Sequence, residues 1–468
     1  MKPDKNSNSK EELFERMPAP QALMTLALPT IVSQLINLIY NVGDTFFVGK
    51  TGDPYKIAGV SLGFVIFFFT IVFANMYGIG GGGLIARLLG VKEYDRARKI
   101  SMFAVYAALL TSAVYSLAVA VFMTPLLTLL GASEKTIGYA KEYLTWAVVF
   151  GGIPIIMSNV FAQLVRNVGY SKQAWFGLSA GGILNLFLDP LFMFVIFPEG
   201  KEVFGAAFAT FLSNLIILIY FIRLFKKISK ETSLSLDPRI GMPESRDIRE
   251  MYSVGIPSGI MVGLFDVANI FMNRHMAAHG DLQLAAMGII LKAERLPYAI
   301  GLGISQGGMP LIAYNYSSGN HKRMREVIRI GRIIGITVSV LSVVLYILFA
   351  GGIFRFFLST GGSANAESLQ TIEYGVRFMR LRCIASPFSF MCYHTNYLLQ
   401  GMGDGKDTLI LAVLRSLVFY VSLIFIMDAA FGMDGLAAAF PISEFVATIN
   451  AFVVSERVMR KAEKRTAG

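Results

Sequence analysis

Residues 57–82 read IAGVSLGFVIFFFTIVFANMYGIGGG, a run of 26 positions without a charged side chain. At about 1.5 Å of rise per residue, a helix of this length crosses the ~30 Å hydrocarbon core of a bilayer. Continuously apolar runs of this kind also exclude outer-membrane strands, which alternate over ~10 residues. The predicted spans are 24–48, 56–82, 99–123, 142–165, 174–197, 204–225, 251–276, 284–312, 327–354, 373–399, 408–431 and 435–456. We therefore predict an all-α polytopic membrane protein with twelve transmembrane helices.

The composition of the chain agrees with this class. Of the 468 residues, 54% are hydrophobic and only 16% are charged, against about 25% charged in soluble domains. The two cysteines, Cys383 and Cys392, exclude a disulfide scaffold and a cysteine-based zinc cluster. Residues 1–20 are polar and lack the apolar core of a signal peptide, so the first apolar run is expected to stay as an anchor.

The net charge of +11 is distributed very unevenly along the chain. The two termini and the loops after spans 2, 4, 6, 8 and 10, counted with the adjoining span ends, hold 29 of the 42 Lys and Arg residues. The opposite loops hold five. Because basic loops stay on the cytoplasmic side, both termini are predicted to be cytoplasmic. The basic charge is thus a topology signal, and no nucleic-acid partner is expected.

The second half of the sequence repeats the first. LALPTIVSQ at 26–34 matches SVGIPSGIM at 253–261, and FGAAFAT at 204–210 matches DGLAAAF at 434–440. GGGLIARLLGVKEYDRARK at 81–99 likewise matches GGMPLIAYNYSSGNHKRMR from residue 307. Two six-helix lobes in the same orientation imply a pseudo-two-fold axis along the membrane normal, an architecture of alternating-access transporters. The predicted parts are a cytoplasmic tail at 1–23, an N-lobe at 24–225, a cytoplasmic linker at 226–250, a C-lobe at 251–456 and a basic tail at 457–468.

Four polar residues of the N-lobe are predicted to lie at a similar depth, in the outer half of the bilayer. They are Asp44 in span 1, Asn185 and Asp189 on one face of span 5, and Thr210 in span 6. Two neighbouring carboxylates in a low dielectric cannot both be charged, so one holds a proton or a cation bridges them. The alternative is a purely structural pair. Such a pair would be expected in both lobes, whereas the equivalent C-lobe positions fall near Met272 and Tyr420.

Several of these stretches resemble the multidrug and toxic compound extrusion (MATE) family. They are LALPTIVSQLINLIYNVGDTFFVG at 26–49, NLFLDP at 185–190, FGAAFAT at 204–210 and QGGMPLIAYNY at 306–316. The resemblance covers essentially the whole chain. The chain is most similar to the MepA-like and DinF-like bacterial members. It implies an antiporter of a bacterial plasma membrane that exports amphipathic, mostly cationic drugs and toxic compounds in exchange for H⁺ or Na⁺, without another cofactor.

The resemblance also assigns roles to individual residues. Positions matching the coupling-ion site of the family are Asp44, Asn185, Asp189 and Thr210. Positions matching or lying near substrate-binding positions are Asn37, Tyr40, Asn159 and Asp266. Pro29 in span 1 is expected to be a hinge. Glu294 and Glu444 are further intramembrane acids, and Glu444 is expected to be unpaired.

The sequence gives less support to other functions. A lipid-linked oligosaccharide flippase of the same superfamily remains an alternative, favoured only by Arg377, Arg380 and Arg382 at the outer end of span 10. The chain lacks a Walker A sequence, so ATP is not the direct drive. It shows neither a metal-ligand pattern nor a convergent catalytic set, so no enzyme is expected. A bundle of this size needs no partner chain, and a monomer in the lipid bilayer is expected.

Overall fold

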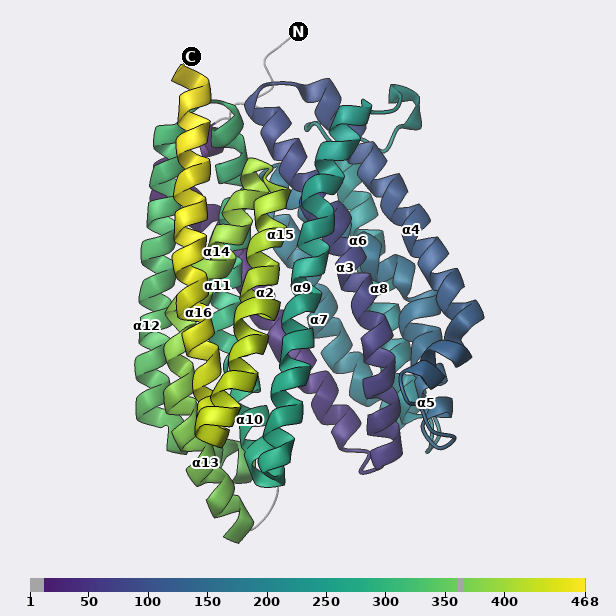
Figure 1. Ribbon diagram of the computed structural model, residues 1–468. Helices are drawn as coiled ribbons and strands as arrows, with labels where there is room; N and C mark the ends of the chain where they lie inside the picture. Colours follow the sequence, from purple (N-terminus) through teal and green to yellow (C-terminus); the bar gives the residue numbers. More distant parts are fainter. Residues whose placement is uncertain (1–11, 360–365, 468) are drawn as a thin grey trace.

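The computed structural model describes residues 12–359 and 366–467, without the side chains of residues 44, 45, 359 and 465–467. Within these ranges the regular elements are all helical (Figure 1). Short π-helical or 3-10 segments carry the letter η. The first half contains η1 (Glu12–Arg16), α2 (Ala19–Gly49), α3 (Pro54–Gly90), α4 (Tyr94–Leu129), α5 (Ile137–Leu144), η2 (Thr145–Phe150), α6 (Gly152–Asn167), α7 (Ser171–Leu191), η3 (Phe192–Ile196) and α8 (Glu202–Ile228). The second half contains η4 (Pro238–Ile240), α9 (Ser245–His279), α10 (Asp281–Ala293), α11 (Arg295–Ser317), α12 (His321–Ser359), α13 (Ala366–Arg382), η5 (Cys383–Ala385), α14 (Ser386–Met402), α15 (Gly405–Val413), η6 (Leu414–Val421) and α16 (Ser422–Ala467).

These helices occupy all twelve predicted spans. Eight helical stretches are long and apolar enough to cross a membrane, and residues 137–167 form a further span that is bent by 47°. One of the eight, residues 405–464, is a hairpin of two spans, because the backbone leaves the helical conformation at Gly432 (φ 58°) and turns back (Figure 1). The two predicted spans that remain, 284–312 and 373–399, are each formed by two helices with a break between them: α10 with α11, and α13 with α14. The predicted all-α, twelve-helix fold is thus confirmed for the described residues.

Several helices extend beyond the predicted spans at the end of the bundle that carries both termini. α8 continues to Ile228 and α9 already begins at Ser245, so the connection between the lobes covers 229–244 rather than 226–250. α16 runs to Ala467, so the predicted basic tail is a helical extension. Charged residues end an apolar span but not a helix, because their long side chains can reach water from its last turns.

The amino-terminal segment differs more from the prediction of a tail. Leu13 and Phe14 of η1 are buried, and with the first two turns of α2 they pack on α11 and α12 of the second half. Tyr314 donates a hydrogen bond to Glu15 at 2.6 Å, and Arg323 donates one to the carbonyl of Phe14 at 2.8 Å. Residues 12–23 are therefore part of the interface between the lobes.

Two pseudo-equivalent helix crossings join the lobes. α9 meets α3 where Gly255 lies against the backbone at Met76 and Gly80, and α2 meets α11 where Ala27 lies against Gly307 and Ile31 lies against Gly303. The equivalent positions differ by 228 on one helix (27 and 255) and by 227 on the other (80 and 307). A constant offset in both crossings is the signature of a two-fold relation between the lobes.

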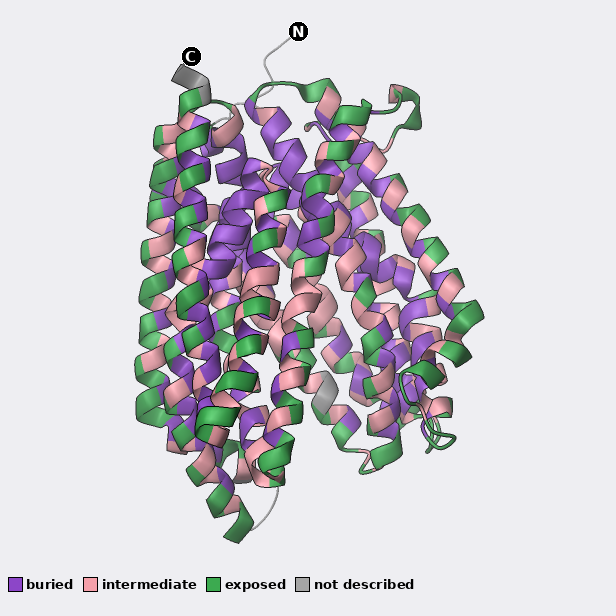
Figure 2. Ribbon diagram, viewed as in Figure 1, coloured by how far each residue is buried: buried purple, intermediate pink, exposed green. Residues whose placement is uncertain are grey.

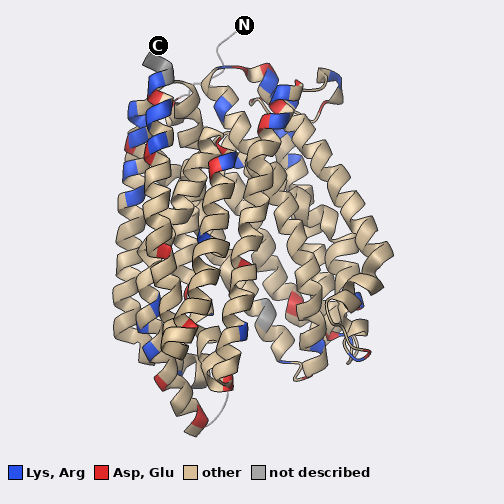
Figure 3. Ribbon diagram, viewed as in Figure 1, with Lys and Arg blue, Asp and Glu red and all other residues tan. Residues whose placement is uncertain are grey.

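The lobes meet mainly in the half of the bundle near the termini. Figure 2 shows buried residues concentrated there, whereas toward the opposite end the helices of the two lobes diverge (Figure 1). Ion pairs reinforce the contact: Arg96 of α4 binds Asp247 of α9 at 2.6 Å, and Arg87 of α3 binds Glu250 at 3.1 Å. Most Lys and Arg residues also lie at this end of the bundle (Figure 3).

Candidate functional site

Three of the four predicted N-lobe residues come together in the structure. Asp189 near the end of α7 is fully buried, and Asn185 and Thr210 are 2% and 4% exposed. When the Asn185 amide nitrogen faces the carboxylate, it donates to Asp189 Oδ2 at 2.9 Å. The amide oxygen then accepts from Thr210 Oγ1 at 3.3 Å and from the Thr210 backbone nitrogen at 3.1 Å. This orientation satisfies both ends of the amide and joins α7 to α8.

The local sequence explains why the carboxylate lies at this point. Pro190 follows Asp189 directly, and a proline within a helix leaves the carbonyl four residues earlier, here that of Leu186, without its usual donor. The helix then loosens into the π-helical segment η3. Such segments occur frequently at functional sites.

The fourth predicted residue, Asp44, is on the neighbouring helix α2, but its side chain lies outside the described residues. The backbone one position earlier, at Gly43, packs directly on Leu186 of α7. Gly182, one turn earlier in α7, packs likewise on Ile36 and Tyr40. The main chain at position 44 therefore lies beside the α7 segment that carries Asn185 and Asp189. The pairing of the Asp44 and Asp189 carboxylates stays a prediction.

The C-lobe contains a different buried network. Arg382 at the end of α13 is fully buried and donates to Glu294 Oε1 at 2.8 Å. A second guanidinium nitrogen donates to the hydroxyl of Tyr420 at 3.1 Å, and the guanidinium carbon lies 4.3 Å from the ring centre of Phe440. A charge in a membrane span is costly unless it is paired in this way.

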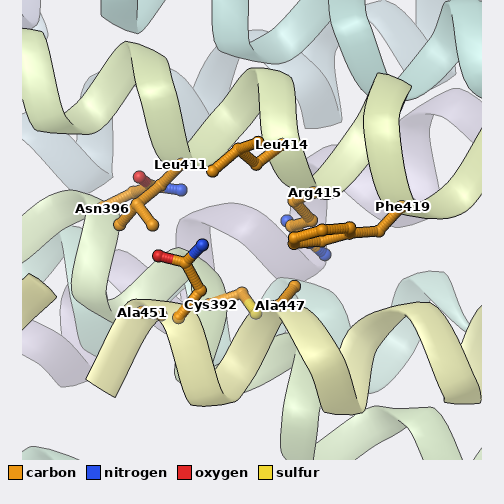
Figure 4. Close-up of a pocket in the computed structure, with 9 residues that line it drawn as sticks. Cys392, Asn396, Leu411, Leu414, Arg415, Phe419, Ala447 and Ala451 are labelled. Carbon is orange, nitrogen blue, oxygen red and sulfur yellow. The ribbon is translucent and has the colours of Figure 1, made fainter. Parts of the chain in front are cut away.

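A second buried ion pair lies nearer the termini in the same lobe. Arg415 of η6 donates to both carboxylate oxygens of Glu444 in α16, at 2.8 and 3.0 Å. Arg415 also borders a cavity of about 10 Å³, which has room for about one water molecule (Figure 4). The cavity is lined by Cys392, Asn396, Leu411, Leu414, Arg415, Phe419, Ala447, Asn450 and Ala451. It is therefore too small for an organic substrate.

The family of the chain follows from the pattern of its two halves. A model of the MatE family matches residues 29–191 and again residues 257–426, which together are well over half of the chain. The chain belongs to the MatE family. The two matched segments coincide with the two lobes, as the internal repeat requires.

Known MatE proteins resemble this chain over nearly its whole length. The multidrug export protein MepA of Staphylococcus haemolyticus is 29% identical over 442 residues, which cover 94% of each chain. The protein of the same name from Staphylococcus aureus is 29% identical over 443 residues. A crystal structure of MATE in complex with MaL6 matches the fold with a TM-score of 0.91, at 22% identity and over 99% of this chain and 100% of the other. An outward-facing multidrug resistance MATE transporter matches with a TM-score of 0.89, also at 22% identity and over 99% and 100% of the two chains.

The remaining predicted site residues of this MatE chain lie on three different helices. Asn37 and Tyr40 are half-buried on α2, and Asn159 on α6 donates to the carbonyl of Ile155 at 2.9 Å. Asp266 is exposed on α9 of the other lobe, where Arg295 attracts it electrostatically. The predicted substrate residues are thus distributed over both lobes. α2 continues as a helix through Pro29.

One expectation about charged residues is wrong. Glu444 is not unpaired, because Arg415 binds it from η6. Of the three arginines that favoured the alternative function, Arg382 is neutralised by Glu294 and Arg377 pairs with Asp434. These pairings were not evident from the sequence because the partners are 29 to 88 residues apart. The sequence did contain one signal for these ion pairs: opposite charges lie within the spans of the same lobe, and an unpaired charge in a membrane span is costly.

The N-lobe arrangement suits a small hard cation or a proton. Carboxylate, amide and hydroxyl oxygens are the ligands that hard cations prefer. Ser213 of α8 also lies within 3.4 Å of the Asn185 amide, so the group around Asp189 contains a further hydroxyl.

Proposed function

We propose that this chain is a secondary antiporter that exports amphipathic, mostly cationic organic compounds in exchange for H⁺ or Na⁺. The observation that carries the proposal is the fully buried carboxylate of Asp189, held by Asn185 in the N-lobe. The relatives named multidrug export protein support the substrate class. The fold contributes two lobes that can rock against each other, which is the basis of alternating access.

We further propose the orientation of the chain in a bacterial plasma membrane. The end that carries the termini holds most of the Lys and Arg residues, so it would face the cytoplasm (Figure 3). The lobes diverge toward the opposite end, so the described arrangement would be open to the outside (Figure 1). We expect the chain to act as a monomer.

In the proposed cycle, the coupling ion enters from the outside and binds at Asp189, together with Asp44. Loss of the negative charge would let α2 bend at Pro29, where the helix already lacks one backbone hydrogen bond. The bend would narrow the space bordered by Asn37 and Tyr40 and expel the substrate. Release of the ion then requires the lobes to separate at the cytoplasmic end, which breaks pairs such as Arg96 with Asp247.

The driving force depends on the net charge that the exchange moves. Exchange of one monovalent cationic substrate for one H⁺ or Na⁺ moves no net charge, so only the concentration gradient of the ion drives it, whereas export of a neutral substrate moves one charge inward with the ion. One elementary charge that crosses a potential of about 150 mV releases roughly 3.5 kcal/mol. Because 1.4 kcal/mol corresponds to a factor of ten, this supports a substrate gradient of a few hundredfold.

The experiment is efflux of a fluorescent organic cation from proteoliposomes, driven separately by a pH gradient and by a Na⁺ gradient. Asp189→Asn keeps the shape of the side chain but cannot lose a proton or balance a cation, so coupled efflux is expected to disappear. Asp281→Asn, on the exposed first turn of α10, is the matched control and should transport normally. Coupled efflux by Asp189→Asn at the wild-type rate would refute the site.

A lipid-linked oligosaccharide flippase is the weaker of the two candidate functions. That alternative depended on the basic residues of α13 being available for a pyrophosphate. Two of the three, Arg377 and Arg382, are already engaged by Asp434 and Glu294.

A further inference from the structure

The repeat relates the N-lobe site to a particular place in the C-lobe. Thr210 corresponds to Phe440 in the matching segments 204–210 and 434–440, and Asp189 corresponds to the region of Tyr420. Both helical stretches contain a π-helical segment, although not at equivalent positions: η3 follows Asp189, whereas η6 ends directly after Tyr420. The rings of Tyr420 and Phe440 also lie together, 5.1 Å apart.

The guanidinium of Arg382 lies between these two C-lobe residues. It donates to the Tyr420 hydroxyl at 3.1 Å and lies over the Phe440 ring at 4.3 Å, while Glu294 supplies the negative charge at 2.8 Å. In the N-lobe, the equivalent place holds a buried carboxylate with an amide and a hydroxyl. One lobe therefore presents oxygen ligands and a negative charge where the other presents a covalently attached cation.

We propose that Arg382 is a built-in cation that fills the C-lobe counterpart of the coupling-ion site, so that the N-lobe alone exchanges the coupling ion. This inference rests on the proposed function, because it concerns the number and place of the ions that drive transport. Arg382 neutralises Glu294 and thereby keeps this C-lobe site indifferent to external H⁺ and Na⁺. A covalently attached cation cannot dissociate, so the site has no ion-dependent step of its own.

The surroundings of Glu294 define what removal of Arg382 would leave behind. The groups that face or influence Glu294 are Arg382 of α13, Tyr420 of η6, Tyr346 of α12, Cys383 of η5 and Glu444 of α16. Arg382 is the only cation in this set, and the charge of Glu444 is already balanced by Arg415. Without Arg382, Glu294 would be a partly buried carboxylate without a counter-charge, and it could bind a proton or a metal cation from solution.

The test uses the purified full-length chain in detergent and measures the midpoint of thermal unfolding across a series of pH values and Na⁺ concentrations. All variants carry Asp189→Asn, which removes the N-lobe site. The proposal expects that this background alone has lost its dependence on the coupling ion. Adding Arg382→Met should restore a rise of the midpoint with H⁺ or Na⁺, and adding Glu294→Gln to that variant should abolish the rise again. Adding Arg382→Lys instead keeps a cation and should give no rise.

Two results would overturn the proposal. The first is a folded Asp189→Asn/Arg382→Met variant whose midpoint does not change with either ion. The second needs no substitution of Arg382: ion dependence that persists in Asp189→Asn and disappears with Glu294→Gln would show that the C-lobe binds a coupling ion despite Arg382. This second measurement decides the question if Arg382→Met does not fold.

Failure of the proposed function gives a different result. In that case the wild-type chain shows no ion-dependent midpoint at all, whereas a gain of ion dependence in Arg382→Met that requires Glu294 would still support the built-in cation.

Discussion

Asp189 and Arg382 are both fully buried, but they are satisfied in different ways. Arg382 has a full counter-charge in Glu294, so its charge is fixed. Asn185 binds the Asp189 carboxylate through a neutral amide and thereby orients it. An oriented, buried carboxylate is the group that the proposed function uses to bind a coupling ion.

The hydroxyl of Thr210 can be tested by two substitutions, one that removes the hydroxyl and one that removes the methyl group. Thr210→Val removes the hydroxyl, whereas Thr210→Ser keeps it. Because one hydrogen bond contributes about 1 kcal/mol, the ion concentration for half-maximal efflux should rise about fivefold in the valine variant. The serine variant should stay near the wild type in the same proteoliposome assay. Equal behaviour of both variants would remove Thr210 from the site.

The Arg415–Glu444 pair allows a stability prediction. Glu444 is 1% exposed, so Glu444→Gln leaves a nearly buried guanidinium without its counter-charge. Breaking one partner of such a pair typically costs about 3–5 kcal/mol, and replacing both partners costs much less. We therefore expect a lower unfolding midpoint in detergent for Glu444→Gln than for Arg415→Met/Glu444→Gln. The reverse order would mean that the pair is not coupled in the folded chain.

The sequence predicted the N-lobe group better than the C-lobe network for a physical reason. Asn185 and Asp189 are one helical turn apart, and the depth of Thr210 follows from the rise per residue, so both could be placed from span ends alone. Glu294 and Arg382 are 88 residues apart on interrupted spans. Their contact depends on how α10, α11 and α13 pack, which hydropathy does not encode.

At the scale of the elements, the helix crossings determine how closely the lobes can approach. A Cβ atom on Gly255 would run into the backbone carbonyl of Met76, and one on Gly303 would lie 2.5 Å from the Cα atom of Ile31. Backbone atoms cannot move aside as a flexible side chain can. These glycines therefore set the spacing of α3 with α9 and of α2 with α11.

Gly255→Ala should consequently weaken the closed interface between the lobes. We expect faster proteolysis or thiol labelling at the end that carries the termini, together with slower coupled efflux. Gly288→Ala in α10 is the matched control, because an added Cβ there meets no atom within 4 Å. If both variants gave the same labelling rate as the wild type, the crossing would not limit the approach of the lobes.

At the scale of the whole molecule, transport requires contacts between the lobes that form and break. Gln34 of α2 donates to Gln306 of α11 at 3.0 Å, close to the point from which the lobes diverge. This contact connects the two lobes directly and lies away from the buried acids. It is therefore suited to a reversible cross-link that leaves the ion site intact.

Gln34→His/Gln306→His places two imidazoles where the two amides now meet. Zn²⁺ should bridge them and stop efflux, and a chelator should restore it. Each single variant provides a control, since one imidazole alone cannot hold the lobes together. Continued transport by the double variant with bound Zn²⁺ would show that the lobes need not separate at this level.

The docking of residues 12–16 on the second lobe also has a consequence for biosynthesis. Glu15 and its partner Tyr314 are 299 residues apart. At translation rates of about 5–20 residues per second, roughly 15–60 s pass between the emergence of the two. During that time Leu23, Leu26 and Ala27, which end fully buried, have no partner helix from the C-lobe. The first helix to enter the membrane is therefore among the last to reach its final packing.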